Sequence, residues 1–227
     1  MDIKVVLVDI DNTLLDFNKC ARVALKAALE QNGFAYTDDM YPVFERENNA
    51  IWKELEQGLL NRDELHAQRF CRILKALGLD ESRGIAVEEV FQKEVGEGAE
   101  HVTGALEALK HISARYPVYA ASNARQERQV KRLQKAGMMP YIKAVFSSED
   151  LGANKPAAAF FDGVMARLPG IAPADCVIIG DSLSADILGG KNYGIKTIWY
   201  NHDHLPVPAD CPADHVVDAI TDIMGIL

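Results

Sequence analysis

The sequence has few cysteines, no long apolar run and too little positive charge to balance its acidic residues. Its four cysteines form no Cys-x-x-Cys pair, which excludes a disulfide scaffold and leads us to expect reduced thiols in a cytoplasmic protein. The apolar run nearest the start, Val5–Val8, is too short for a signal peptide or a membrane span. We therefore expect no membrane partner.

The shortage of positive charge limits the partners of the protein. Lys and Arg number 24 against 33 Asp and Glu, so the formal net charge is −9. Such a surface repels nucleic-acid backbones, and we expect no nucleic-acid partner. A small anionic substrate remains compatible with it, because a metal ion and one lysine can reverse the charge locally.

What is present is a strand pattern typical of an α/β protein. Residues 3–8 are a short β-branched run, as in a buried central strand. After the Gly-rich residues 96–98, short apolar runs alternate with amphipathic stretches, which predicts a Rossmann-like, doubly wound parallel sheet. The expected later strands are 118–121, 144–146, 177–179 and 197–200, and the intervening helices include 126–136 and 158–168.

Between the first strand and the rest of the sheet, the pattern is helical throughout. Asn61 with Glu64 makes a capped helix start, and Phe70 opens an apolar face with helical spacing. The first strand needs the later strands as partners, so we expect an α/β core of residues 1–16 and 98–227 and an inserted all-helical cap of residues 17–97. Such an insertion is expected over the carboxyl ends of the strands.

Reactive side chains follow four of the expected strands. In a parallel sheet these strand ends face one crevice, so we expect the side chains to converge there. They are Asp9 and Asp11, Ser122 and Asn123, Lys155, and Asp181 with Asp186.

These residue types together predict phosphoryl transfer. Carboxylates as close as Asp9, Asp11 and Asp181 would repel one another without a cation, and an all-oxygen ligand set suits Mg²⁺. Ser122 and Asn123 precede a helix whose N-terminus favours an anion, Ser122 also being expected as its N-cap.

The Asp-x-Asp spacing suggests a different role for each of the two aspartates. Residues two apart at a strand end can face the same side, so Asp9 can attack phosphorus while Asp11 protonates the leaving oxygen. In a second step Asp11 would activate water to hydrolyse the aspartyl-phosphate, with Lys155 and Mg²⁺ holding the phosphate oxygens.

These residues, in this order, resemble the four motifs of the haloacid dehalogenase superfamily of phosphatases, along essentially the whole chain. The matching residues are Asp9-x-Asp11-x-Thr13, then Ser122, Lys155, and Gly180-Asp181 with Asp186.

The resemblance implies a role for each position. Asp9 would be the nucleophile and a metal ligand, Asp11 the acid/base whose backbone carbonyl also meets the metal, and Asp181 a further ligand. Asp186 would bind the metal through water or support the ligands. The phosphate-binding residues would be Thr13, Ser122, Asn123 and Lys155.

Within the superfamily, Asn49-Ala50-Ile51-Trp52 and Trp199-Tyr200-Asn201 resemble bacterial pyrimidine 5′-nucleotidases that act on noncanonical nucleotides. This makes Trp52 a candidate substrate-binding residue, as a platform for a base, with a place in the cap core as the alternative. His202 and His204 lack further clustered ligands, and we expect them in a loop.

The sequence thus predicts a Mg²⁺-dependent phosphomonoester hydrolase acting on a small phosphorylated metabolite, foremost a pyrimidine nucleoside monophosphate. The alternatives are a phosphatase for phosphoglycolate or a sugar phosphate, a phosphomutase, and a catalytically silent binding protein. Either a monomer or a homodimer is compatible with the sequence.

Overall fold

The computed structural model describes residues 3–227, which divide into two compact units. One consists of the described residues up to Phe17 together with Ala99–Leu227, and the other of Asn18–Gly98. No described helix is both long and apolar enough to cross a membrane.

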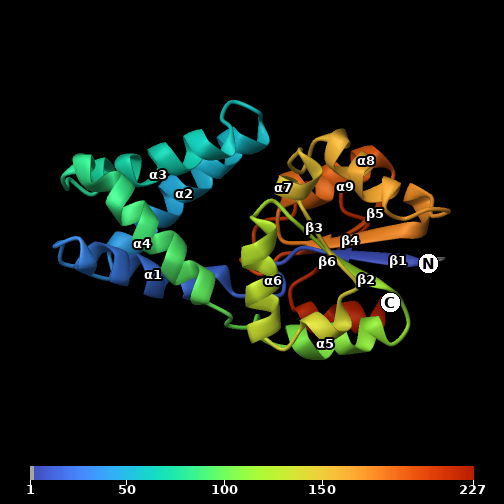
Figure 1. The fold of residues 1–227 in the computed structure, drawn as a ribbon. Helices are drawn as coiled ribbons and strands as arrows, with labels where there is room; N and C mark the ends of the chain where they lie inside the picture. Colours follow the sequence, from blue (N-terminus) through green and yellow to red (C-terminus); the bar gives the residue numbers. More distant parts are fainter. Residues whose placement is uncertain (1–2) are drawn as a thin grey trace. The chain divides into compact units, whose positions relative to one another are not determined.

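The larger unit is built on a parallel sheet. Among the described residues it has six strands in the order β3-β2-β1-β4-β5-β6, and each neighbouring pair is parallel (Figure 1). This confirms the predicted doubly wound α/β fold. The strands are β1 (Val5–Val8), β2 (Val118–Ser122), β3 (Val145–Ser147), β4 (Cys176–Gly180), β5 (Lys196–Tyr200) and β6 (His215–Val217).

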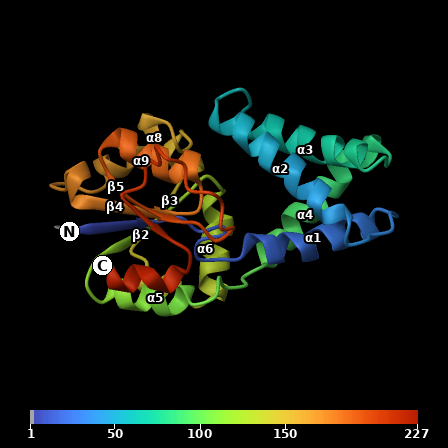
Figure 2. The same cartoon turned by 180° about the vertical axis from the view of Figure 1, so that it is seen from behind.

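Side chains of the central strands alternate between two cores. In β1, Val6 and Val8 pack on one face with Leu109 of α5, whereas Val5 and Leu7 pack on the other. Both faces are therefore apolar, as the continuous hydrophobic run requires. Helix α5 and the C-terminal turn η5 cover one face, and α8 and α9 the other (Figures 1 and 2). The helical elements of this unit are α5 (Ala105–Ser113), α6 (Gln126–Lys135), η2 (Met139–Tyr141), α7 (Ser148–Leu151), α8 (Ala158–Ala166), η3 (Pro173–Asp175), the π-helical η4 (Leu183–Leu188), α9 (Gly189–Tyr193) and η5 (Ile220–Gly225).

The smaller unit is all-helical, as predicted. Its core contains a cluster of aromatic rings from three helices, with Phe44, Phe70 and Phe91 5.0–6.1 Å apart between ring centroids. Asn61 and Glu64 form the predicted capping box at the start of α3. The helices are α1 (Phe17–Gln31), α2 (Met40–Glu56), α3 (Arg62–Ala76), η1 (Glu81–Arg83) and α4 (Gly84–Glu97).

A buried polar network crosses the helical unit. Glu88 of α4 accepts hydrogen bonds from Arg69 at 2.7 and 3.0 Å. Its Oε1 also lies 2.8 Å from Nδ1 of His66. Arg69 also donates to Asn48 of α2 at 3.2 Å. Three helices are thus joined by groups that would be costly to bury unpaired.

Candidate active site

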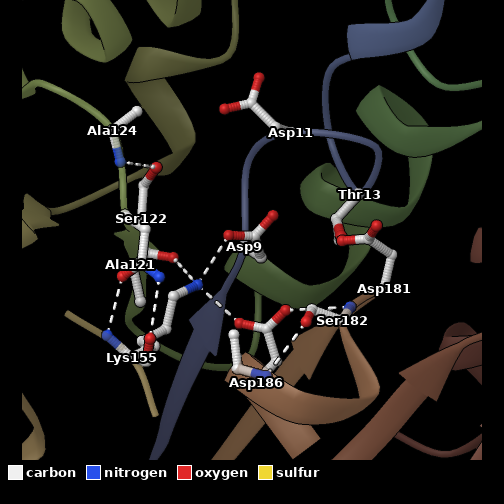
Figure 3. Close-up of polar contacts among 12 residues, drawn as sticks. Asp9, Asp11, Thr13, Ala121, Ser122, Ala124, Lys155, Asp181, Ser182 and Asp186 are labelled. Atoms are coloured by element: carbon white, nitrogen blue, oxygen red, sulfur yellow. Dashed lines mark hydrogen bonds and ion pairs between the residues drawn. The ribbon is translucent and has the colours of Figure 1, made fainter. Parts of the chain in front are cut away.

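Three carboxylates meet where neighbouring central strands end. Asp9 follows β1 and Asp181 follows the adjacent strand β4, while Asp186 comes from η4 (Figure 3). One oxygen from each of the three lies within 4.8 Å of the others. The order of the sheet reverses between β1 and β4, which is where open α/β folds bind ligands.

The buried ammonium of Lys155 holds this cluster together. Its Nζ donates to Oδ1 of Asp9 at 2.7 Å, to Oδ1 of Asp186 at 2.6 Å and to the carbonyl oxygen of Ala121 at 2.7 Å (Figure 3). These contacts use the three hydrogens of the ammonium. Asn123 fixes the backbone of Lys155 from both sides, since its side chain accepts from the Lys155 N–H and donates to the Lys155 carbonyl.

Burial and charge shift the pKa values of the cluster in opposite directions. Burial raises the pKa of Asp9 well above its usual range, and the nearby Asp186 and Asp181 add to this, against the attraction of Lys155. The pKa of Asp186 is also raised, first by burial. For Lys155, burial alone would lower the pKa, but Asp186 and Asp9 outweigh it and raise it above the ordinary value. One lysine therefore compensates the carboxylates only in part.

The cluster fits a hard divalent cation. Its ligand atoms are carboxylate oxygens, which suit Mg²⁺ better than a nitrogen- or sulfur-preferring ion. Burial and the neighbouring carboxylates disfavour the ionised forms of Asp9 and Asp186, and a bound cation would favour them.

Local backbone features fix two of the carboxylates. Oδ2 of Asp186 accepts the N–H of Ser182 at 3.2 Å, which ties η4 to the end of β4. Trp199 of β5 is fully buried and donates from its indole nitrogen to the carbonyl of Asp181 at 2.9 Å. Thr13 of the first motif is buried, and its hydroxyl lies 3.4 Å from Oδ1 of Asp181.

The carboxylate of Asp11 points away from the cluster (Figure 3). It accepts hydrogen bonds from Arg132 of α6, at 2.5 Å to Oδ1, and from Gln129, at 2.6 Å to Oδ2. Burial alone would raise the pKa of Asp11, but the charge and hydrogen bond of Arg132, with Arg128 nearby, lower it. Asp11 is therefore held as a carboxylate in this arrangement.

Ser122 ends β2 and lies at the expected edge of the sheet. The prediction that it caps the following helix is wrong, because α6 begins at Gln126 and its N-cap residue is Arg125. Instead, the Ser122 hydroxyl oxygen accepts the N–H of Ala124 at 3.1 Å within the connecting loop. The loop between β2 and α6 is therefore longer than it would be if Ser122 both ended the strand and capped the helix.

Three site residues were missed by the sequence interpretation. Gln129 and Arg132 belong to no motif. Gln129 falls on the same predicted helix face as Leu133, and a polar residue on that apolar face could have indicated a site residue. His202 lies in a loop, as expected, but its Nε2 is 3.7 Å from Oδ2 of Asp181. That interaction, as the largest cause, raises the pKa of His202.

Trp52 belongs to the helical unit, where it is partly buried. It packs against a small apolar cluster made by Ile51, Leu55 and Leu65. This packing favours the cap-core alternative for Trp52, while its role as a base platform stays a prediction.

Comparison with known proteins assigns the family. The family model for haloacid dehalogenase-like hydrolases matches residues 3–194. The chain belongs to this family. The pyrimidine 5′-nucleotidase PynA of Streptococcus pneumoniae (strain ATCC BAA-255 / R6) is 35% identical over 229 residues, covering 99% of this chain and 94% of PynA. The HAD-hydrolase YfnB of Bacillus subtilis (strain 168) is 34% identical over 210 residues, covering 92% of this chain and 89% of YfnB.

Solved structures agree with this assignment. The crystal structure of YfnB bound to magnesium superposes with a TM-score of 0.91 at 31% identity, covering 99% of this chain and 98% of YfnB. A dehalogenase structure matches with a TM-score of 0.78 at 18% identity, covering 99% and 97% of the two chains, and shares the fold. The prediction of a phosphatase enzyme of the haloacid dehalogenase superfamily is confirmed.

Proposed function

We propose that this haloacid dehalogenase-like hydrolase is a Mg²⁺-dependent phosphomonoesterase that forms an aspartyl-phosphate on Asp9. The observation that carries the proposal is the contact of Lys155 with Asp9 inside a cluster of three carboxylates. A nucleophile beside a cation and an all-oxygen metal site is the arrangement that phosphoryl transfer needs.

In the first step, a carboxylate oxygen of Asp9 attacks phosphorus and the P–O bond to the leaving group breaks. Lys155 lies beside the attacking group and offsets the negative charge that gathers on the phosphate oxygens. Arg132 favours the ionised form of Asp11, so Asp11 must first take up a proton from solvent, which it then gives to the leaving oxygen. Because both Asp11 oxygens accept hydrogen bonds in this structure, at least one of these bonds must open for that transfer.

In the second step, water attacks the phosphorus of the aspartyl-phosphate and Asp9 is released. Asp11, ionised after it has given up its proton in the first step, then accepts the proton of the water. The metal-binding residues in this proposal are Asp9, Asp181 and Asp186, with the backbone carbonyl of Asp11, and the bound Mg²⁺ would supply charge neutralisation and orientation of the phosphate.

For the substrate, we propose a pyrimidine nucleoside 5′-monophosphate. The support is the 35% identity with PynA, named a pyrimidine 5′-nucleotidase, along nearly the full length of both chains. We further propose that the helical unit, residues 17–97, serves as the cap that selects the leaving group, and that the enzyme works in the cytoplasm.

The substrate is tested by phosphate release in the presence of Mg²⁺. The panel contains UMP, dUMP, dTMP, purine monophosphates, phosphoglycolate and several sugar phosphates. Preference for the pyrimidine monophosphates is expected. Preference for another ester would keep the chemistry and refute the substrate, whereas transfer between positions of one sugar phosphate without free phosphate would indicate a mutase.

The nucleophile is tested by Asp9→Asn, which keeps the size of the side chain and removes its charge. We expect turnover to fall by more than about a thousandfold, because no covalent intermediate forms. Asp210→Asn, an exposed position in the loop before β6, is the matched control and should keep wild-type activity. Near-normal turnover by Asp9→Asn would exclude the mechanism.

A further inference from the structure

Two polar side chains of α6 are as buried as core residues. Gln129 is 0% exposed and Arg132 1% exposed, and they lie one helical turn apart. Neither belongs to the family motifs found in the sequence. Polar groups at such depth need partners, and theirs are Asp11 and Ser122.

Arg132 fixes which way the amide of Gln129 points. A guanidinium group only donates hydrogen bonds, and Nη1 of Arg132 lies 2.9 Å from Oε1 of Gln129. The amide oxygen must therefore face Arg132. The amide nitrogen must then face the opposite side, toward Asp11 and Ser122.

The amide nitrogen of Gln129 has two hydrogens, and both are used. One points to Oδ2 of Asp11 at 2.6 Å and the other to Oγ of Ser122 at 3.0 Å. The two acceptors come from the loop after β1 and from the end of β2. Gln129 thus links the proposed acid/base to a proposed phosphate-binding residue.

This arrangement decides what the hydroxyl of Ser122 can do. A hydroxyl has two acceptor lone pairs and one hydrogen. The N–H of Ala124, at 3.1 Å, and the amide of Gln129 occupy both lone pairs. Only the hydrogen of the hydroxyl remains, and the hydroxyl can donate it in a hydrogen bond to an acceptor such as a phosphate oxygen.

We propose that Gln129, oriented by Arg132, is a positioning residue that makes Ser122 a hydrogen-bond donor for the phosphoryl group and holds the Asp11 carboxylate near Ser122. The proposal rests on the proposed function, in which Ser122 binds phosphate and Asp11 is the acid/base. Gln129 would act through these two residues without touching the substrate.

Two substitutions of similar size separate the donor role from packing. Gln129→Glu replaces the amide nitrogen by an oxygen that accepts, so the Ser122 hydroxyl would turn toward it and Asp11 would be repelled. Gln129→Met removes the hydrogen bonds and keeps the length of the side chain. The matched control is Gln134→Glu, an exposed position on the same helix.

The first readout is binding of inorganic phosphate to the Mg²⁺-loaded protein, measured by calorimetry, which needs no turnover. Both Gln129 variants are expected to bind phosphate about tenfold more weakly, the effect of losing one hydrogen bond to a charged group. Gln134→Glu should stay within about twofold of the wild type. In a Ser122→Ala background, Gln129→Met should change the affinity less than about twofold, because the two residues act together.

The second readout compares kcat for phenyl phosphate and for p-nitrophenyl phosphate. Nitrophenolate leaves with little help from an acid, whereas phenolate depends on it more. Displacing Asp11 should therefore lower kcat for phenyl phosphate about tenfold more than for p-nitrophenyl phosphate. A purely structural defect would lower both equally.

The proposal is overturned if Gln129→Met binds phosphate like the wild type, or if its loss is as large in the Ser122→Ala background. It is also overturned if both Gln129 variants fail to fold by circular dichroism, since Gln129 would then be a structural residue. A wild-type protein that releases no phosphate from any ester would refute the proposed function, and phosphate binding would still decide the role of Gln129 in orienting Ser122.

Discussion

Gly180 lies where the end of β4 approaches the side chain of Asp186. A Cβ at this position would lie 2.2 Å from Oδ2 and 2.3 Å from Cγ of Asp186, closer than atoms can approach. The absence of a side chain at residue 180 therefore permits Asp186 to enter the carboxylate cluster. This is a steric requirement, since no unusual backbone angle accompanies it.

Gly180→Ala is expected to displace Asp186 and to weaken Mg²⁺ binding about tenfold or more, as the loss of a positioned ligand partner does. The measurement is a Mg²⁺ titration followed by the rise in Tm. Gly225→Ala is the control, because a Cβ there meets nothing within 4 Å. Unchanged Mg²⁺ affinity in Gly180→Ala would contradict this view of the Asp186 site.

At the scale of residues, the sequence predicted those side chains whose position follows from a strand end. Asp9 and Asp181 come directly after buried strands, so the parallel sheet brings them together. Gln129 and Arg132 depend on which turn of α6 faces the loop after β1, and sequence spacing does not specify that. Likewise, the approach of His202 to Asp181 depends on the path of a loop.

At the scale of elements, α3 and α2 begin differently. The side chain of Asn61 accepts the N–H of Glu64, and Glu64 accepts the N–H of Asn61 at 2.8 Å. Asp39, the N-cap of α2, has a helical backbone conformation and makes no such side-chain bond. Only the first of these caps satisfies free N–H groups of its helix.

Asn61→Ala should therefore lower the free energy of unfolding by about 1 kcal/mol. Asp39→Ala is the comparison variant and should cost no more than a few tenths of a kcal/mol, from its charge near the helix start alone. Urea unfolding at pH 7 measures both. Equal losses would mean that the capping box contributes nothing beyond charge.

The network of α2, α3 and α4 makes stability depend on pH. Burial alone would raise the pKa of Glu88, but Arg69 and His66 outweigh it and lower the pKa below 4.5. The folded state therefore binds the proton more weakly than the unfolded state. The contribution of Glu88 to the free energy of unfolding is complete above the pKa of the unfolded state, about 4.5. It disappears as the pH falls through the lower pKa of the folded state.

Glu88→Gln should consequently lower the free energy of unfolding by about 2 kcal/mol at pH 7, because a buried arginine is left without its counter-charge. The difference from the wild type should shrink steadily below pH 4.5. Urea unfolding of the two proteins between pH 3 and pH 7, at roughly constant ionic strength, tests this. A difference that is independent of pH would indicate that only packing was changed.

Elements were predicted from sequence where their burial was strong. The run Val5–Val8 and the strand near residue 177 were recognised because both faces of these strands are apolar. The strand β6 was missed, since His215 and Val216 are exposed and only Val217 is buried. β3 is equally short and also lies at an edge of the sheet, but its three residues are buried, so exposure rather than length explains why β6 was missed.

For the whole molecule, the carboxylate cluster links metal binding to stability. An ion that binds only the folded state stabilises it by roughly 2.7 kcal/mol at a hundred times its dissociation constant. We therefore expect Mg²⁺ to raise Tm and a chelator to reverse the rise. NaCl at matched ionic strength is the control, because a net charge of −9 also responds to screening. In Asp181→Asn most of the Mg²⁺-specific rise should be lost, and an equal rise in that variant would place the ion elsewhere.

Of the described strands, β1 comes first in the sequence, yet it lies in the middle of the sheet. Val6 pairs with Val118 on one side and with Val177 on the other, so one edge of β1 stays open until β2 is made and the other until β4 is made. The residues Asn18–Gly98 form a compact unit, and we expect them to fold in that interval. A nascent chain that stops before β4 would expose the edge of β1 that β4 covers, and it would hold Asp9 without Asp181. The synthesis of β4 is therefore expected both to bring Asp181 to Asp9 and to cover the edge of β1 that could pair with other chains.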